Sequence, residues 1–272
     1  MIDIVIISKD RACQLDLMLR TLYKHFKLKS NISVFYLAST PDYESGYSLL
    51  KNKYKNISLK KQINNFYDEL LVLLNSLSNE YLLFLPDDVV FTGDIKEDDI
   101  QVKTFLRYSN IMNINLRVGK YLKYNYYNDT EEVLSPEIDS NGVYNWRTGR
   151  HVLWTHPMTT CCHIARRYDY ISIIKNAGNS INLNCLEDFI IRNIPDKDLV
   201  VCYDYPKLVE LCINIVNTTH ITNIHGNTSI RMLNDKFLDN KIINDSFIEN
   251  LPKEYFRFSN LNLTFNSRKK II

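Results

Sequence analysis

Two adjacent aspartates follow a short apolar run near residue 87. Five apolar residues, Tyr81–Leu85, lead into Pro86 and then into Asp87 and Asp88. Paired carboxylates supply the oxygen ligands that Mg²⁺ and Mn²⁺ prefer in proteins. Aspartate is also a favoured turn residue. On this stretch alone, a plain turn and a metal or phosphate site are both open interpretations.

A second polar group stands near the N-terminus. Ser8, Lys9, Asp10 and Arg11 follow an apolar run that begins at Ile2. Phosphates need cations or metals, and a ribose or base needs hydrogen-bond acceptors such as aspartate. Together with Asp87–Asp88, the group suits a nucleoside diphosphate held through a metal, unless the two are unrelated loops. It has no glycine-rich fingerprint, which argues against a dinucleotide site and a P-loop.

The elements that must position these two groups alternate along the first 90 residues. Buried strands are predicted at residues 2–7, 32–38, 57–59 and 81–85, and apolar residues at helical spacing predict helices at 14–26, 43–54 and 62–77. This alternation predicts an α/β fold with a mostly parallel sheet and helices on both faces. Ligands bind at the carboxyl ends of such strands, so both polar groups are expected to face one crevice.

The regular alternation stops near residue 110. We expect an edge strand at 113–118 and an irregular, aromatic-rich flap on the substrate side at 119–150. Further strands are predicted at 151–154, 159–165, 199–203 and 208–216, and helices at 97–106, 168–177 and 184–193.

Two more groups could carry chemistry. Glu187 and Asp188 fall near the start of a predicted helix, where a carboxylate can act as a general base; alternatively, Asn184 caps that helix with Glu187 at the N3 position. His220 and His225 form the second group, in which His225, before Gly226, is the better candidate. A lone histidine is more often structural.

Composition sets limits on the class of protein. The chain has 272 residues, 45% hydrophobic content and a net charge of +2, so nothing predicts nucleic acid as a partner. Six cysteines form no CxxC pair, and adjacent Cys161 and Cys162 would point to opposite faces of a strand; we expect buried, reduced thiols. Neither a signal peptide nor a transmembrane segment is predicted, and a cytoplasmic location is expected.

These motifs give the chain a resemblance to a known group. The opening strand, the turn Ser8–Arg11, the helix Gln14–Phe26 and the acidic motif at Asp87–Asp88 resemble GT-A-type nucleotide-sugar glycosyltransferases, close to the family-2-like group. That group carries a DxD or EDD motif after its fourth strand. Here Pro86 and Val89 stand where versions of the motif have another acidic residue.

The resemblance implies a fold, a reaction and roles. The fold would be a GT-A-like (Rossmann-like) α/β sheet, and the reaction a transfer from a nucleotide-sugar donor, most often a UDP-sugar, to a saccharide or other hydroxyl acceptor. The implied roles are donor binding, metal binding of Mn²⁺ or Mg²⁺, and catalysis as the base of an inverting displacement. Donor binding would fall on Ser8, Lys9, Asp10, Arg11 and Asp87. Metal binding would fall on Asp88 and His225, and catalysis on Asp188 with Glu187.

The chain is expected to form one continuous domain. Residues 1–110 would be the nucleotide-sugar-binding half, and residues 111–272 the acceptor-side half with the C-terminal tail. Two other functions stay open: a nucleotidyltransferase, which shares the sheet and the acidic site, and a catalytically inactive module that keeps the GT-A fold.

Overall fold

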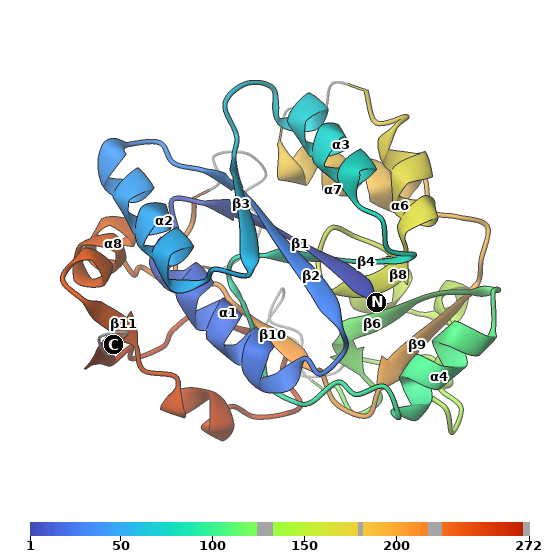
Figure 1. Cartoon of the computed structure of the whole chain (residues 1–272). Helices are drawn as coiled ribbons and strands as arrows, with labels where there is room; N and C mark the ends of the chain where they lie inside the picture. Colours follow the sequence, from blue (N-terminus) through green and yellow to red (C-terminus); the bar gives the residue numbers. More distant parts are fainter. Residues whose placement is uncertain (124–132, 179–181, 217–224, 269–272) are drawn as a thin grey trace.

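A mixed eight-stranded sheet forms the centre of the computed structural model, and helices cover both of its faces (Figure 1). The structure describes residues 1–123, 133–178, 182–216 and 225–268. The strand order is β3-β2-β1-β4-β8-β6-β9-β7. This arrangement confirms the predicted α/β class with a mostly parallel sheet.

The N-terminal part builds one side of the sheet from four parallel strands. The strands are β1 (Ile2–Lys9), β2 (Ser30–Leu37), β3 (Ile57–Lys61) and β4 (Tyr81–Pro86). The helices between them are α1 (Ala12–His25), α2 (Pro41–Lys53) and α3 (Phe66–Ser76). All seven elements were predicted, and the acidic motif does follow the fourth parallel strand.

The later part of the chain extends the same sheet with mixed directions. Its strands are β6 (Ile111–Gly119), β7 (Val143–Asn145), β8 (His163–Arg166) and β9 (Leu199–Tyr203). Its helices are α4 (Ile100–Arg107), α5 (Val152–Thr155), α6 (Arg167–Ile174) and α7 (Leu183–Arg192), with a 3-10 turn at Trp146–Thr148. Strand β8 runs antiparallel to both β4 and β6, and so joins the two parts.

A three-stranded sheet closes the region behind the acidic motif. It contains β5 (Val89–Phe91), β10 (Leu208–Leu211) and β12 (Arg257–Phe258). Strand β10 is antiparallel to β5, so the chain returns at residue 208 to lie directly beside the residues after Asp88.

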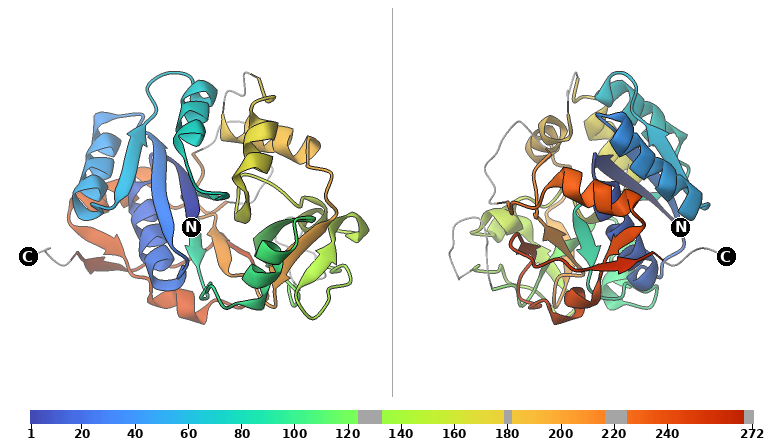
Figure 2. Two further views of the ribbon diagram at one scale, coloured as in Figure 1. Left: turned by 45° about the vertical axis from the view of Figure 1, so that its right-hand side comes forward. Right: turned by 90° about the vertical axis from the view of Figure 1, so that its left-hand side faces the viewer.

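The C-terminal elements pack against the first two helices (Figure 2). Helix α8 (Ile230–Leu238) and strand β11 (Lys241–Ile243) contact α1, and α8 also contacts α2. A 3-10 turn at Ser246–Asn250 and strand β13 (Phe265–Ser267), which pairs with β11, complete the tail.

The core lies on both faces of the sheet because side chains alternate along each strand. On β1, Ile4 and Ile6 belong to a cluster that includes residues of α1, α2 and α4. Val5, between them, faces a second cluster with residues of α3, α6 and α7. Burial on both faces explains why the parallel strands read as continuous apolar runs.

Three predicted elements are wrong. The strand predicted at 113–118 is not at an edge: β6 lies between β8 and β9 and all of its residues are buried. Residues 151–154 form helix α5 instead of a strand, and His151 caps it by accepting from the backbone N–H of Leu153. Strand β10 ends at Leu211 instead of residue 216.

Two other expectations concern the whole chain. Both predicted halves supply strands to the central sheet, and the division at residue 110 stays a prediction. Of the helices described here, none is long and apolar enough to cross a membrane.

Candidate active site

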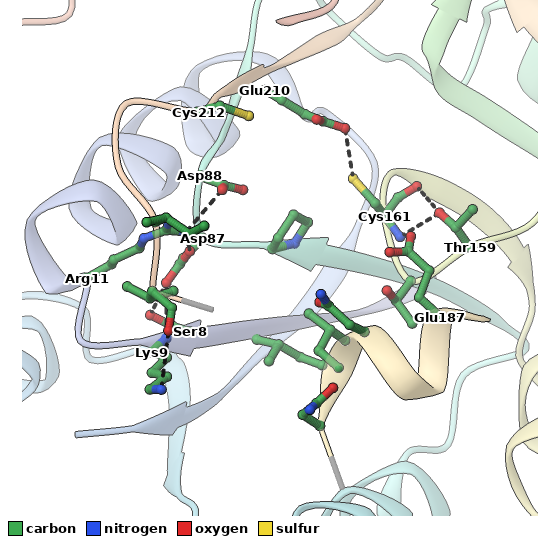
Figure 3. A pocket seen from close by; sticks show the side chains of 18 of the residues that line it. Ser8, Lys9, Arg11, Asp87, Asp88, Thr159, Cys161, Glu187, Glu210 and Cys212 are labelled. Atoms are coloured by element: carbon green, nitrogen blue, oxygen red, sulfur yellow. Dashed lines mark hydrogen bonds and ion pairs between the residues drawn. The ribbon is translucent and has the colours of Figure 1, made fainter. Parts of the chain in front are cut away.

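A cleft of about 890 Å³ opens at the carboxyl ends of β1 and β4. Eight of the nine predicted site residues line it: Ser8, Lys9, Arg11, Asp87, Asp88, Glu187, Asp188 and His225. Figure 3 shows the acidic motif with Arg11 on one side of the cleft and Glu187 on the other, with Cys212 above Asp88 and Glu210 at the top of the view. The structure therefore brings together residues that lie up to about 200 positions apart in the sequence.

The parallel register of β1 and β4 places the two polar groups side by side. Ile7 is opposite Pro86, so Ser8 and Asp87 are the first residues beyond that pair. The Ser8 hydroxyl donates to Asp87 Oδ2 at 2.8 Å, and the backbone N–H of Lys9 donates to the same oxygen at 3.1 Å. Asp87 is thereby fixed at the strand ends, as the sheet topology predicts.

Asp10 is the predicted site residue that does not line the cleft. It has a φ of +58°, a left-handed conformation that Asp tolerates better than most residues. Its carboxylate accepts from the backbone N–H of Ser39 at 2.7 Å and from the Ser39 hydroxyl at 2.8 Å. Asp10 therefore ties the turn after β1 to the loop after β2, where it orders the neighbouring site residues.

Arg11 forms an ion-paired group with the acidic motif. Its Nη1 lies 3.0 Å from both Asp87 Oδ1 and Asp88 Oδ2. Burial opposes the charge on Arg11, but the two carboxylates raise its pKa above the usual value, so it stays protonated. Burial raises the pKa of Asp87 to about 6, because the loss of hydration outweighs the attraction to Arg11. We call Arg11, Asp87 and Asp88 the acidic group.

The opposite side of the cleft is carried by helix α7. Its N-cap is Asn182, whose side chain accepts from the backbone N–H of Cys185 at 3.0 Å. The predicted cap at Asn184 is therefore wrong, and Glu187 is not the N3 partner of a capping box. Both Glu187 and Asp188 line the cleft instead. Burial raises the pKa of Glu187, and Asp188 is exposed.

The cleft also contains a second charged group, which was not predicted from the sequence. The buried carboxylate of Glu210 accepts from Arg117 Nη1 at 3.1 Å and from Arg257 Nε at 2.8 Å, and all three residues line the cleft. Burial opposes ionisation of Glu210, but Arg257 and Arg117 hold its pKa below the usual value. We call these three residues the basic group. The available signal was a charged residue inside an otherwise apolar strand, which is rare unless it is paired.

The adjacent cysteines differ from the expectation for a strand. Cys161 and Cys162 precede β8, and Cys162 has a φ of +68°. This left-handed residue turns the two side chains to the same side, and their sulfurs lie 2.8 Å apart. Burial raises the pKa of the Cys162 thiol, in keeping with the expected buried thiols.

Two histidines lie at the cleft, whereas Trp154 lies in the core. His225 lines the cleft, and burial together with Arg257 lowers its pKa, which favours the neutral imidazole that can bind a metal. His156 also lines the cleft, whereas Trp154 is fully buried against Tyr144. His220 lies outside the described residues.

The side chains present can hold the divalent cation implied by the resemblance only if another group supplies further oxygen ligands. Both oxygens of Asp87 already accept hydrogen bonds, and Asp88 shares Arg11 with it. Within the described ranges, no three His, Cys, Asp or Glu side chains form a metal-binding cluster. Mg²⁺ is usually held by one or two carboxylates plus substrate phosphates. The residues therefore suit a cation that arrives with phosphate oxygens.

Comparison with known proteins adds one curated relative. No family model matches the chain. The chain is 24% identical, over 307 aligned residues, to the bifunctional glycosyltransferase pgtA of Dictyostelium discoideum. The alignment covers 98% of this chain but only 38% of the relative, so the chain spans well under half of that relative's length.

Solved structures show partial likeness. S. aureus TarS 1–349 superposes with a TM-score of 0.46 at 13% identity, over 75% of this chain and 58% of that one. Mannosyltransferase PcManGT from Pyrobaculum calidifontis, in complex with GDP-Man and Mn²⁺, gives 0.41 at 11% identity, over 76% and 57%. The 4-diphosphocytidyl-2C-methyl-D-erythritol synthase from Anaerococcus prevotii gives 0.43 at 12% identity, over 88% and 96%.

The fold class rests on the strand order itself and not on these superpositions. The curated relative confirms the resemblance to glycosyltransferases that the strand, turn and acidic motif predicted.

Proposed function

We propose that this chain is a glycosyltransferase that moves a sugar from a nucleotide-diphosphate sugar to a hydroxyl acceptor. One observation carries the proposal: two carboxylate pairs from distant parts of the chain, Asp87–Asp88 and Glu187–Asp188, line the same cleft. Transfer of a glycosyl group needs one site for a diphosphate leaving group and another for an acceptor proton. The similarity to a curated glycosyltransferase supports this assignment.

The donor would bind at the strand ends of β1, β2 and β4. Leu37 lines the cleft there and offers apolar surface to a base, and Lys9 supplies a cation beside the diphosphate. Asp87, held by Ser8 and the Lys9 backbone, would contact the ribose or the phosphate. A divalent cation, when bound through Asp88 and His225, would supply positive charge to the leaving diphosphate.

The acceptor would bind beside helix α7. Asp188 is the proposed base because it is an exposed carboxylate at the cleft, able to take a proton from an acceptor hydroxyl. A base on the side opposite the donor fits an inverting single displacement. The UDP donor and the cytoplasmic location stay predictions from the sequence.

A donor panel tests the proposal. UDP- and GDP-sugars are incubated with the protein and Mn²⁺, and nucleotide release is measured. We expect release with one donor. Asp188→Asn should lose at least about a hundredfold, the size typical of lost acid–base catalysis, and Asp88→Ala should also lose activity because it removes a ligand of the cation. The matched control is Asp196→Asn, since Asp196 is fully exposed and does not line the cleft.

Nucleoside triphosphates added to the panel, together with a measurement of nucleotide binding, separate the two other functions. A nucleotidyltransferase would release pyrophosphate from a nucleoside triphosphate, and an inactive module would bind nucleotide without turnover. Full nucleotide release by Asp188→Asn would remove Asp188 as the base, while full release by Asp88→Ala would refute its role at the donor.

A further inference from the structure

The guanidinium of Arg11 occupies the space between the two aspartates of the acidic motif. Its Nη1 alone contacts Asp87 Oδ1 and Asp88 Oδ2, each at 3.0 Å (Figure 3). A divalent cation held by Asp88 would stand within a few ångströms of a fixed positive charge. Such like charges repel strongly where water is largely excluded.

Arg11 is held in place from its other edge. Its Nε donates to Asn214 Oδ1 at 2.9 Å, and its Nη2 donates to the backbone carbonyl of Asn214 at 2.8 Å. Asn214 in turn donates to Gln14 Oε1 at 3.0 Å. With 6% of its surface exposed, Arg11 cannot leave the aspartates without breaking these hydrogen bonds in a buried setting.

The aspartates have little remaining capacity for a metal. Asp87 Oδ2 accepts from Ser8 and Lys9, and Asp87 Oδ1 accepts from Arg11. Asp88 is the less buried partner, with 16% of its side chain exposed. The acidic group carries two negative charges and one positive, so it keeps a single net negative charge, which is a weak attraction for a free divalent ion.

We propose that Arg11 is a resident counter-cation that excludes free divalent metal from the Asp87–Asp88 site and admits the metal only together with a nucleoside diphosphate. The inference rests on the proposed function for the identity of the diphosphate. A diphosphate supplies the oxygen ligands that the aspartates lack, and its negative charge offsets Arg11. The site thereby selects the metal–nucleotide complex over the metal alone.

Calorimetric titration with MnCl₂ tests this, alone and with saturating UDP or GDP. For the wild type we expect Mn²⁺ to bind at least about tenfold more tightly with one diphosphate than without, a difference of about 1.4 kcal/mol. Arg11→Met should bind Mn²⁺ alone at least about tenfold more tightly than the wild type. Arg11→Lys, which keeps the charge, should bind free Mn²⁺ as weakly as the wild type.

Arg20→Met is the matched control. Arg20 lies on the same helix, is ion-paired to buried Asp16 and does not line the cleft. It should leave Mn²⁺ binding unchanged, and thermal denaturation of each variant verifies folding.

Two results overturn the inference: equal Mn²⁺ affinity of the wild type with and without diphosphate, or no gain of Mn²⁺ affinity in Arg11→Met. If Arg11→Met does not fold, Arg11→Gln replaces it, because glutamine also removes the charge but keeps an N–H donor for Asn214. Because metal binding is measured instead of turnover, a protein that transfers no sugar can still show the effect of Arg11, so the two proposals fail separately.

Discussion

The cleft contains two buried charged groups of opposite composition. In the acidic group, two carboxylates share one guanidinium. In the basic group, two guanidiniums share the carboxylate of Glu210. The carboxyl pKa values move in opposite directions: that of Asp87 rises to about 6 because burial dominates, and that of Glu210 falls because two arginines outweigh burial. The same residue types thus give one site that tolerates protonation and another that resists it.

The two groups also differ in how the chain assembles them. Asp87 and Asp88 are neighbours, and Arg11 comes from the adjacent strand end. The basic group draws on β6, β10 and β12, three strands far apart in sequence. A group made of adjacent strand ends is visible in the sequence, whereas a group made of distant strands is visible only after the strands are paired.

The largest effect is expected from neutralising Glu210. Glu210→Gln leaves Arg117 and Arg257 without the carboxylate that both contact, and should lower the free energy of unfolding by about 3–5 kcal/mol. Urea denaturation measures this. The control is Glu249→Gln, which breaks the exposed pair with Lys24 and should cost at most about 1 kcal/mol. Equal losses in the two variants would mean that the basic group contributes no more than a surface pair.

A change of pH should have a smaller effect on the free energy of unfolding, and its sign should be opposite for the two groups. The folded-state pKa of Asp87 lies above its unfolded value, so the folded chain binds more protons between about pH 6 and 4. Its contribution therefore raises stability as the pH falls through that window, by about 1 kcal/mol between pH 7 and 5. The stability supplied by ionised Glu210, whose folded pKa is depressed, is present above about pH 4.5 and is lost below it.

Variant pH profiles separate these contributions. Asp87→Asn should remove the rise in the free energy of unfolding between pH 6 and 4. At pH 7 its free energy of unfolding should lie within about 1 kcal/mol of the wild-type value, because the neutral amide avoids the cost of burying a charge. Parallel profiles of wild type and Asp87→Asn would contradict the assigned pKa of Asp87.

The smallest effect is expected at the cap of helix α7, which presents Glu187 and Asp188 to the cleft. Asn182→Ala removes the side chain that accepts from the backbone N–H of Cys185, and should cost about 0.5–1 kcal/mol in thermal or urea unfolding. Asn184→Ala leaves that hydrogen bond intact and should cost less. A larger loss for Asn184→Ala would restore the cap position that the sequence predicted.

Much of the donor side could be predicted because it depends on local patterns. Continuous apolar runs predict β1 to β4, and helical spacing predicts the helices between them. The register of the parallel strands then brings Ser8 beside Asp87. Asp10 shows the limit of that reasoning. It lies in the predicted turn, but its carboxylate accepts a hydrogen bond from Ser39 instead of facing the cleft.

The acceptor side could be predicted only in part. The helix carrying Glu187 and Asp188 was found from its apolar spacing, but its cap was misplaced by two residues. The central position of β6 was missed because β9 pairs with its outer side and β8, which also follows it in sequence, inserts between β4 and β6. Such an insertion depends on non-local pairing, which no periodicity within a segment records. Arg117 and Glu210 were missed for the same reason.

The pairing of β10 with β5 has a consequence for biosynthesis. The backbone N–H of Leu211 donates to the carbonyl of Asp88 at 2.6 Å, so the acidic motif gains this support only after residue 211 has left the ribosome. Arg257, which completes the basic group, emerges still later. Because a domain folds as a unit and long-range pairing is slow, a nascent chain ending near residue 110 would expose β5 as an unpaired edge. The cleft is therefore completed only after Arg257 has been synthesised, and chains cut before that residue should aggregate instead of leaving a donor-binding fragment.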